Sequence, residues 1–295
     1  MKTSSYVRLY LYSLIALLAF AANSVLCRLA LYEQAIDPAS FTLIRLISGA
    51  VTLIILVLVL KQASTIKQVV NNGDWLSASA LFVYAAGFSF AYIALPAGLG
   101  ALLLFGSVQI TMMLYSLLSG ERLVTLQWFG FITAIFGLIY LLFPNSDKLQ
   151  IDSVNTWAIA SLLMILAGIA WGVYSIKGKS VANATLSTTD NFLRASVLAC
   201  VGFSAYLVSN GTIHLSRQGL FLALISGTIT SGIGYAIWYA VLPKLRGTSA
   251  ASMQLSVPVF ASIAGVLLLN EALSLSLIIA SIMILGGVSL VIKYK

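Results

Sequence analysis

Ten stretches of about 20 mostly apolar residues follow one another along the chain, separated by short connections. An α-helix needs about 20 apolar residues to cross the hydrocarbon core of a bilayer, so each stretch is long enough to span a membrane. Hydrophobic residues make up 60% of the chain and charged residues only 8%, too few polar groups to cover the surface of a soluble globule.

The pattern therefore predicts an all-α, polytopic membrane protein with ten transmembrane helices. No connection is long enough for a separate soluble domain, so any function must reside inside the helical bundle. The predicted spans are 9–29, 41–60, 75–95, 98–118, 123–143, 157–176, 191–209, 219–242, 248–269 and 274–292.

The basic residues predict the orientation of the bundle. With ten spans both termini lie on one side, and that side carries 11 of the lysines and arginines in the connections and tails, against 3 on the other. The side richer in basic residues faces the cytoplasm, so we expect both termini there, in a multi-pass protein of the cell inner membrane. The net charge of +8 is scattered rather than clustered, which argues against a nucleic-acid partner.

The second half of the chain repeats the first at a spacing near 150 residues. Residues 120–123 (GERL) correspond to 270–273 (NEAL), and residues 92–96 (YIALP) correspond to 239–243 (YAVLP). Each match is weak alone, but their shared order and nearly constant offset make a chance origin a poor explanation. We expect two five-helix repeats, 1–147 and 148–295.

Five is an odd number, so the second repeat must enter the membrane from the opposite side. Inverted halves suit a transporter, because two conformations that exchange the shapes of the halves can be close in energy, one open inward and one outward. A channel or a membrane enzyme has no equivalent need for this symmetry.

With these motifs the sequence resembles the drug/metabolite transporter superfamily, specifically its bacterial EamA-type members. The resemblance covers nearly the whole chain and implies transport of small molecules, usually export in bacteria. The residues that carry it are Asn23-Ser24 through Arg28, Gly120-Glu121-Arg122-Leu123, Trp128-Phe129-Gly130, Gly137, Trp171-Gly172, Pro258-Val259-Phe260, Asn270-Glu271-Ala272-Leu273 and Gly286-Gly287.

The sequence thus favours a secondary transporter that exports amino acids or similar, partly apolar metabolites by alternating access around a central cavity. Its expected partners are a small-molecule substrate and the lipid bilayer, with no cofactor, as a monomer or a homodimer. An intramembrane lipid-modifying enzyme is one alternative, although it would need convergent His–Asp or Glu pairs at membrane depth, which the sequence lacks. A non-transporting scaffold is another.

Aromatic stripes are the first candidates for the substrate-binding surface. Tyr84 and Phe88 are four residues apart on one face of the third span, and Tyr235 lies on the eighth span with Trp238 beside it. Such rings could stack on a partly apolar solute or hydrogen-bond to it. The alternative is packing between helices or, for Tyr92 at the end of its span, anchoring at the membrane interface.

Polar and aromatic residues within other spans complete the candidate set. Asn23, Gln109 and Gln254 carry amides that must find partners at membrane depth, either another helix or a ligand. Trp171 and Tyr174 on the sixth span receive the same two interpretations.

Arg45 and Arg194 lie about five residues inside their spans and are repeat partners. Either could snorkel to lipid headgroups or form a structural pair, and Asp190 stands four residues before Arg194. The functional alternative is a gate or a counter-charge for a substrate carboxylate. Glu121 and Glu271 each precede a new helix, where we expect them to cap the local turn.

Overall fold

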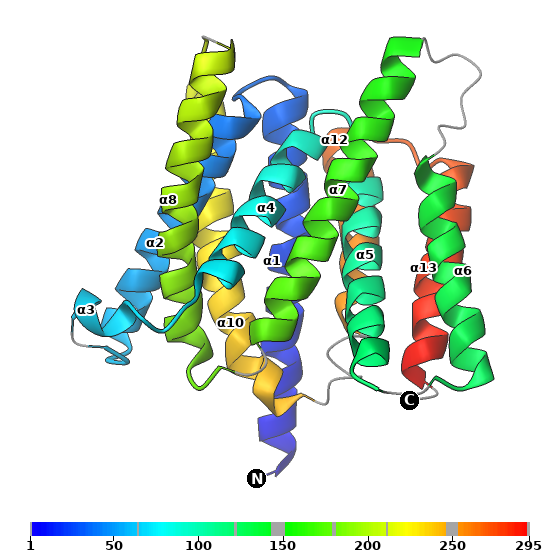
Figure 1. The fold of residues 1–295 in the computed structure, drawn as a ribbon, viewed down its shortest axis with the longest axis horizontal. Coiled ribbons are helices and arrows are strands. Elements are labelled where there is room, and N and C mark those ends of the chain that lie inside the picture. Colours follow the sequence, from blue (N-terminus) through cyan, green and yellow to red (C-terminus); the bar gives the residue numbers. More distant parts are fainter. Residues whose placement is uncertain are drawn as a thin grey trace.

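The structure is a computed structural model in which residues 2–63, 65–120, 123–142, 151–178, 181–210, 212–245 and 253–293 are described. Within these ranges the regular elements are all helical, and Figure 1 shows them arranged as a bundle. They are α1 (Lys2–Tyr32), α2 (Pro38–Val59), α3 (Ile66–Val69), α4 (Trp75–Ala91), α5 (Ala97–Leu118), α6 (Thr125–Leu142), α7 (Ile151–Gly178), α8 (Ala184–Asn210), α9 (Arg217–Ile225), η1 (Ser226–Ile233), α10 (Gly234–Val241), η2 (Leu242–Lys244), α12 (Ser256–Leu269) and α13 (Leu275–Lys293).

Seven of the described helical segments are long and apolar enough to cross a membrane: α1, α2, α5, α7, α8, the continuous run α9–η1–α10, and α13. Three shorter apolar helices, α4, α6 and α12, accompany them. These segments fall on the ten predicted stretches, and the chain is a multi-pass helical membrane protein. The start of α1 and the end of α13 lie at the same end of the bundle, named here the terminal end; the opposite end is the far end (Figure 1).

Local sequence fixes where several helices begin. At the start of α2, the Asp37 carboxylate accepts hydrogen bonds from the Ser40 N–H at 2.8 Å and the Ser40 hydroxyl at 2.6 Å, and Pro38 opens the first turn. Asp74 caps α4 in the same way through Ser77. These caps satisfy backbone N–H groups that a helix leaves unpaired at its first turn.

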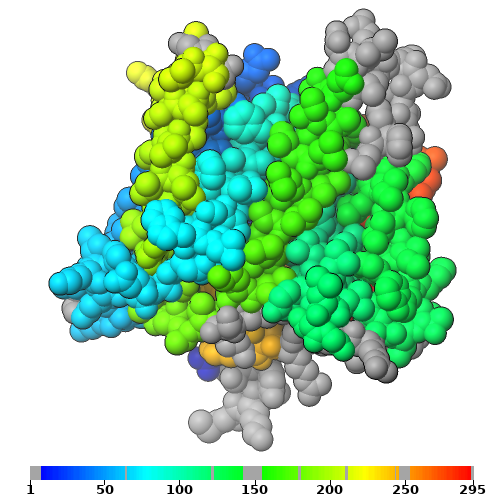
Figure 2. All heavy atoms as spheres, viewed as in Figure 1, coloured from blue at the N-terminus to red at the C-terminus, as the bar shows by residue number. Residues whose placement is uncertain are grey.

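The helices pack in a small number of long contacts. The central group contains α1, α4, α5, α7 and the α9–η1–α10 rod: α7 packs on α4 and α5, and α1 packs on η1, α10 and α12. Helix α2 lies against α8 and η1. In the space-filling view α4 and α7 lie side by side across the front face (Figure 2), while α6 and α13 pair with each other at one edge of the bundle (Figure 1).

The eighth predicted span differs from a regular helix, because residues Ser226–Ile233 form a π-helix between α9 and α10. The wider turn aligns Gly227 and Gly232 on one face, where they meet α2. A Cβ on Gly227 would clash with the Arg45 backbone and the Ser48 hydroxyl, and a Cβ on Gly232 would lie 2.9 Å from Thr52. The two glycines therefore let the backbone of η1 approach α2 closely.

Glycine also brings α6 and α13 together. A Cβ on Gly287 would collide with the Gly130 carbonyl oxygen, and one on Gly130 would lie 2.5 Å from the Gly287 carbonyl oxygen. The neighbouring Gly286 faces no other atom within 4 Å. The close packing of the two helices thus requires glycine at positions 130 and 287 but not at position 286.

We expect Gly287→Ala to destabilise the protein, because the new methyl group meets backbone that cannot move independently. Overpacking of this kind commonly costs about 1–3 kcal/mol of folding free energy. The midpoint of thermal unfolding in detergent measures the effect. Gly286→Ala is the matched control, and equal midpoints for the two variants would contradict the packing argument.

Candidate functional site

An aromatic cluster occupies the centre of the bundle. Tyr84 and Phe88 come from α4, Trp171 from α7, Tyr235 from α10 and Phe20 from α1, and each is no more than 7% exposed. The ring centroids are 4.9 Å apart for Tyr84 and Trp171, 4.9 Å for Trp171 and Tyr235, and 5.6 Å for Phe20 and Tyr235. Four separate helices therefore meet through edge-on and tilted ring contacts, a favourable geometry for aromatic pairs.

A small cavity lies among these rings. Its volume of about 10 Å³ is near the minimum that one water molecule requires. The bundle is therefore closed around its centre, and a solute of metabolite size would need the helices to separate. The lining residues are Phe20, Ser24, Tyr84, Phe88, Leu104, Phe105, Trp171 and Tyr235.

The aromatic contacts continue from the cavity toward the terminal end. Tyr174 stacks on Trp171 with centroids 5.3 Å apart, and its ring meets Tyr239 edge-on at 6.3 Å. The Tyr174 hydroxyl donates a hydrogen bond to Thr188 at 3.4 Å. A second cavity of about 10 Å³ adjoins these side chains. Trp238 packs edge-on against Phe20 at 5.9 Å and is not among the residues that line either cavity.

The three candidate amides are buried but lie away from both cavities. The Asn23 side-chain oxygen accepts hydrogen bonds from the hydroxyls of Ser226 at 2.6 Å and Thr230 at 3.1 Å, so it joins α1 to η1. Gln109 is 3% exposed and Gln254 is 7% exposed, and neither lines the cavities. The Gln254 side-chain oxygen has no hydrogen-bond partner.

Arg45 lies against the aromatic cluster and is 1% exposed, so its side chain does not snorkel to the headgroups. Its Nε donates a hydrogen bond to the Ser231 hydroxyl at 3.1 Å, and its Nη2 donates to the Tyr84 hydroxyl at 2.8 Å. Its Cζ lies 5.1 Å from the centroid of the Tyr84 ring and 4.9 Å from that of Phe88, which places the guanidinium in cation–π range of two cavity walls.

Arg194 has a different environment from its repeat partner. Its Nε and Nη2 each lie 3.1 Å from the Asp190 carboxylate, the structural pair that the i−4 spacing predicts. Asp190 also accepts hydrogen bonds from the backbone N–H groups of Asn71 at 3.0 Å and Gly73 at 2.8 Å. The pair therefore ties α8 to the connection before α4.

An ion pair that sequence reasoning missed closes the far end. Arg28 Nε lies 3.2 Å from the Glu271 carboxylate, and Arg28 Nη1 donates to the carbonyls of Tyr92 at 3.0 Å and Ile93 at 2.9 Å. The same carboxylate accepts hydrogen bonds from the Ala97 N–H at 3.1 and 2.9 Å. The end of α1, the connection before α5 and the connection after α12 are thus joined; we name this set the Arg28–Glu271 network.

Two expectations are corrected at this end. Glu271 caps the start of α5 rather than its own turn, because the fold brings the Ala97 N–H to its carboxylate. Tyr92 is completely buried and donates a hydrogen bond to the Ala97 carbonyl at 3.2 Å, so it does not anchor at the membrane interface. Glu121, the repeat partner of Glu271, lies outside the described residues.

A more exposed ion pair joins α4 to α7 near the terminal end, with Lys177 Nζ 3.0 Å from the Asp74 carboxylate. Burial raises the pKa of that carboxyl, but hydrogen bonds from Ser77 and Lys177 outweigh the burial and lower the pKa to about 2. Because the pKa of the folded carboxyl lies below its ordinary value of 3.8, the resulting stabilisation is present above pH 3.8 and is lost as the pH falls toward 2.

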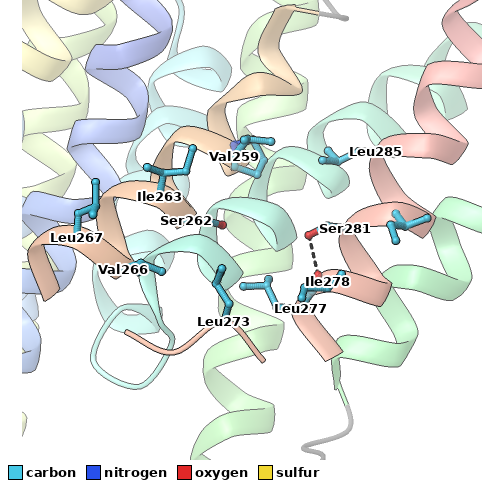
Figure 3. Close-up of a pocket in the computed structure, with 12 residues that line it drawn as sticks. Val259, Ser262, Ile263, Val266, Leu267, Leu273, Leu277, Ile278, Ser281 and Leu285 are labelled. Atoms are coloured by element: carbon cyan, nitrogen blue, oxygen red, sulfur yellow. Dashed lines mark hydrogen bonds between the residues drawn. The ribbon is translucent and has the colours of Figure 1, made fainter. Parts of the chain in front are cut away.

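A larger groove lies between α12 and α13 (Figure 3). Its volume is about 410 Å³, and its lining is aliphatic apart from two serines. The hydroxyl of one of them, Ser281, donates a hydrogen bond to the Leu277 carbonyl at 2.6 Å. Ile263, Leu267 and Ile282 in the lining are 52%, 73% and 69% exposed. This groove opens on the apolar exterior that faces lipid, so the central cluster is the better candidate for a polar solute.

Sequence reasoning also missed four residues of the central cavity: Leu104 and Phe105 on α5, and Phe20 and Ser24 on α1. The two α1 residues are the ones that a sequence pattern could have indicated. They are four residues apart on α1, the same spacing that singled out Tyr84 and Phe88 on α4. The Ser24 hydroxyl is buried and has no hydrogen-bond partner. A polar residue one turn from a mid-span aromatic residue was the available signal.

A multi-pass helical bundle with a buried polar and aromatic centre is the architecture of a membrane transporter, and comparison with known proteins identifies the family. The model of the EamA-like transporter family matches residues 158–293. An uncharacterised protein of Pseudomonas aeruginosa is 44% identical over 285 residues, which are 97% of this chain and 94% of that protein. The chain therefore belongs to the EamA-like transporter family, within the drug/metabolite transporter superfamily, and moves small molecules across a membrane.

More distant relatives carry transport in their names. A protein of Escherichia coli named "Probable amino-acid metabolite efflux pump" is 27% identical, over 70% of this chain and 72% of its own length. An uncharacterised transporter of Bacillus subtilis is 21% identical over 86% of each chain. A solved crystal structure superposes with a TM-score of 0.66 over 97% of both chains at 16% identity, which shows a shared fold.

The Arg28–Glu271 network predicts a change in accessibility when its carboxylate is lost. Glu271→Gln removes the charge that holds α1 to α5; hydrogen bonds to charged groups contribute about 1.5–3 kcal/mol, so opening at the far end should become roughly tenfold more frequent or greater. Cys27, which is 0% exposed and next to Arg28, reports this opening through its rate of labelling by a membrane-impermeant maleimide.

The labelling uses a Cys200→Ser background, because Cys200 is exposed. Glu33→Gln is the matched control, since Glu33 is an exposed carboxylate that follows α1 at the same end. A labelling rate of Cys27 in Glu271→Gln no faster than in Glu33→Gln would show that the network does not hold this end closed.

Proposed function

We propose that the protein is a secondary transporter of the cytoplasmic membrane that exports amino acids or similar, partly apolar metabolites by alternating access. The observation that carries the proposal is the central cavity, whose aromatic walls come from α1, α4, α5, α7 and α10. A solute held there would contact ring faces and a few hydroxyls, the surface that a small molecule with both apolar and polar parts requires.

The arrangement of the helices supports two inverted repeats, 1–147 and 148–295. Under that correspondence α1, α2, α4, α5 and α6 match α7, α8, α9–α10, α12 and α13. The contact of α4 with α7 then has its counterpart in α1 with α10, and that of α5 with α7 in α1 with α12. The pairs α2–α8, α5–α12 and α6–α13 are their own counterparts. The family model, which matches 158–293, covers one such half.

The two ends of the bundle are held by different interactions, as alternating access requires. The Arg28–Glu271 network joins α1, α5 and the α12–α13 connection at the far end. Near the terminal end Tyr174 and Tyr239 meet, and Lys177 pairs with Asp74. In our proposal the two sets of contacts open in turn, so that the cavity is never continuous across the membrane.

The direction and the substrate class rest on relatives and on charge. The Escherichia coli and Salmonella typhimurium relatives are both named as amino-acid metabolite efflux pumps. The excess of basic residues at the terminal end supports a cytoplasmic location for both chain ends. Export then carries solute from the terminal end to the far end.

Two measurements test the proposal. A strain that overexpresses the protein should gain resistance to toxic amino-acid analogues, and the purified protein in liposomes should catalyse counterflow of labelled amino acids. No resistance and no counterflow across a broad panel would contradict the proposed function.

Within that assay we expect Tyr84→Ala to slow counterflow by about 3- to 10-fold, because one aromatic wall contributes about 0.5–1.5 kcal/mol. Tyr10→Ala is the matched control, since Tyr10 is 56% exposed on α1. Both variants must keep the wild-type elution profile in detergent, and equal rates for the two would remove Tyr84 from the site.

A further inference from the structure

Arg45 is a buried cation with no carboxylate partner among the residues that the structure describes. It is 1% exposed in α2, at membrane depth, where an unpaired charge is costly. The groups that meet its guanidinium are two neutral hydroxyls, of Ser231 and Tyr84, and the faces of two aromatic rings. In the described ranges the ion pairs are Arg28–Glu271, Lys177–Asp74 and Arg194–Asp190, and Arg45 takes part in none of them.

Comparison with the repeat partner shows what is missing. Four residues before Arg194 stands Asp190, whose carboxylate neutralises it; four residues before Arg45 stands Phe41. Arg28, the other arginine buried in the bundle, also has a carboxylate partner in Glu271. Within the described residues the chain thus supplies a carboxylate to Arg28 and to the half-buried Arg194, whereas Arg45, beside the central cavity, has neutral partners.

The guanidinium of Arg45 also keeps a free donor. Its Nη1 is completely buried and has no hydrogen-bond partner, and the Ser24 hydroxyl in the cavity lining has none either. A buried donor without an acceptor carries the full free-energy cost of its desolvation, which is larger when the group is charged, so an unpartnered guanidinium donor beside a cavity is a candidate ligand contact. Carboxylates fit this need because a guanidinium donates two parallel hydrogen bonds to their two oxygens.

On these grounds we infer that Arg45 binds the carboxylate of the transported solute while the apolar part of the solute contacts the rings of the central cavity. The inference rests on the proposed function and adds to it the residue that selects the substrate. Tyr84 and Ser231 hold the guanidinium in place between transport events, each through one neutral hydrogen bond that a charged ligand can outcompete.

Counterflow in liposomes with chemically matched solutes tests the inference. The probes are phenylalanine and leucine, their amides, and the amines that remain when the carboxylate is removed, together with a panel of neutral sugars and nucleosides. We expect at least one of the two amino acids to exchange at least tenfold faster than its amide and its amine. Amides or amines that exchange as fast as the acids would overturn the inference and leave the proposed function intact. Neutral sugars or nucleosides that move while both acids are excluded would overturn the inference and the proposed substrate class together.

Variants distinguish a specific role of Arg45 from an effect of the protein's overall charge. Arg45→Gln should abolish the preference for the acid, and Arg45→Lys should keep part of it. Arg217→Gln is the matched control, because it removes an exposed positive charge at the start of α9. An unchanged preference in folded Arg45→Gln would overturn the inference. Absence of counterflow for every solute in the wild type would contradict the proposed function itself.

A second variant keeps Arg45 and gives it a carboxylate partner within the protein. Ser231→Asp places a carboxylate on the residue that already contacts Arg45 Nε. We expect it to lose the preference for acids while its thermal midpoint without ligand stays at or above that of the wild type, as an internal ion pair would produce. A tenfold preference for acids that persists in folded Ser231→Asp would overturn the inference even if Arg45→Gln could not be purified.

Discussion

The hydrocarbon of the bilayer offers neither hydrogen bonds nor counter-charges, and the structure follows from that constraint. Backbone groups are satisfied within helices, and serine hydroxyls inside the spans bond back to carbonyls four residues earlier, as Ser89 does to Ala85 at 2.9 Å. Charges obey the same requirement, since Arg28 and Arg194 each have a carboxylate beside them. The polar groups at the centre of the molecule are those whose hydrogen bonds or charges are not satisfied by residues close to them in the sequence.

That centre is compact and closed. The rings around Trp171 leave only about 10 Å³ of space, while the Arg28–Glu271 network and the contact of Tyr174 with Tyr239 hold the two ends. A resting transporter of this kind excludes water and ions without a separate plug, because the side chains that would hold the solute fill its place. Solute binding must then compensate for the free energy lost when the aromatic rings separate. This requirement favours solutes whose own apolar surface replaces the lost ring contacts.

Much of the architecture could be predicted from the sequence because it depends on local patterns. Span length and hydropathy locate the helices, and the spacing of Tyr84 and Phe88 on one face, echoed by Tyr235, places three of the rings around the cavity. The pair between Arg194 and Asp190 follows from their i−4 separation. In each case the information lies within one or two helical turns.

The rest depends on contacts between distant segments, which no local pattern records. Glu271 meets Arg28 across 243 positions of the chain, and its capping of Ala97 spans 174, so a helix cap was expected on the wrong helix. Asn23 resembles a ligand-binding amide until η1 is seen to supply the hydroxyls that occupy its oxygen. The sequence shows that Arg45 lies inside a span, but its burial and its neutral surroundings appear only in three dimensions.

The π-helix of η1 allows the following part of the rod, which carries Tyr235, to rotate about its axis. In an α-helix each residue turns the chain by about 100°, so converting the whole π-helical segment to i−4 hydrogen bonds would rotate everything after it by roughly that angle without breaking the rod. Tyr235 and Trp238 lie just beyond the π-helical residues Ser226–Ile233. A change of helical pitch in η1 could therefore rotate the rings of Tyr235 and Trp238 about the helix axis, while α9 keeps its position at the far end.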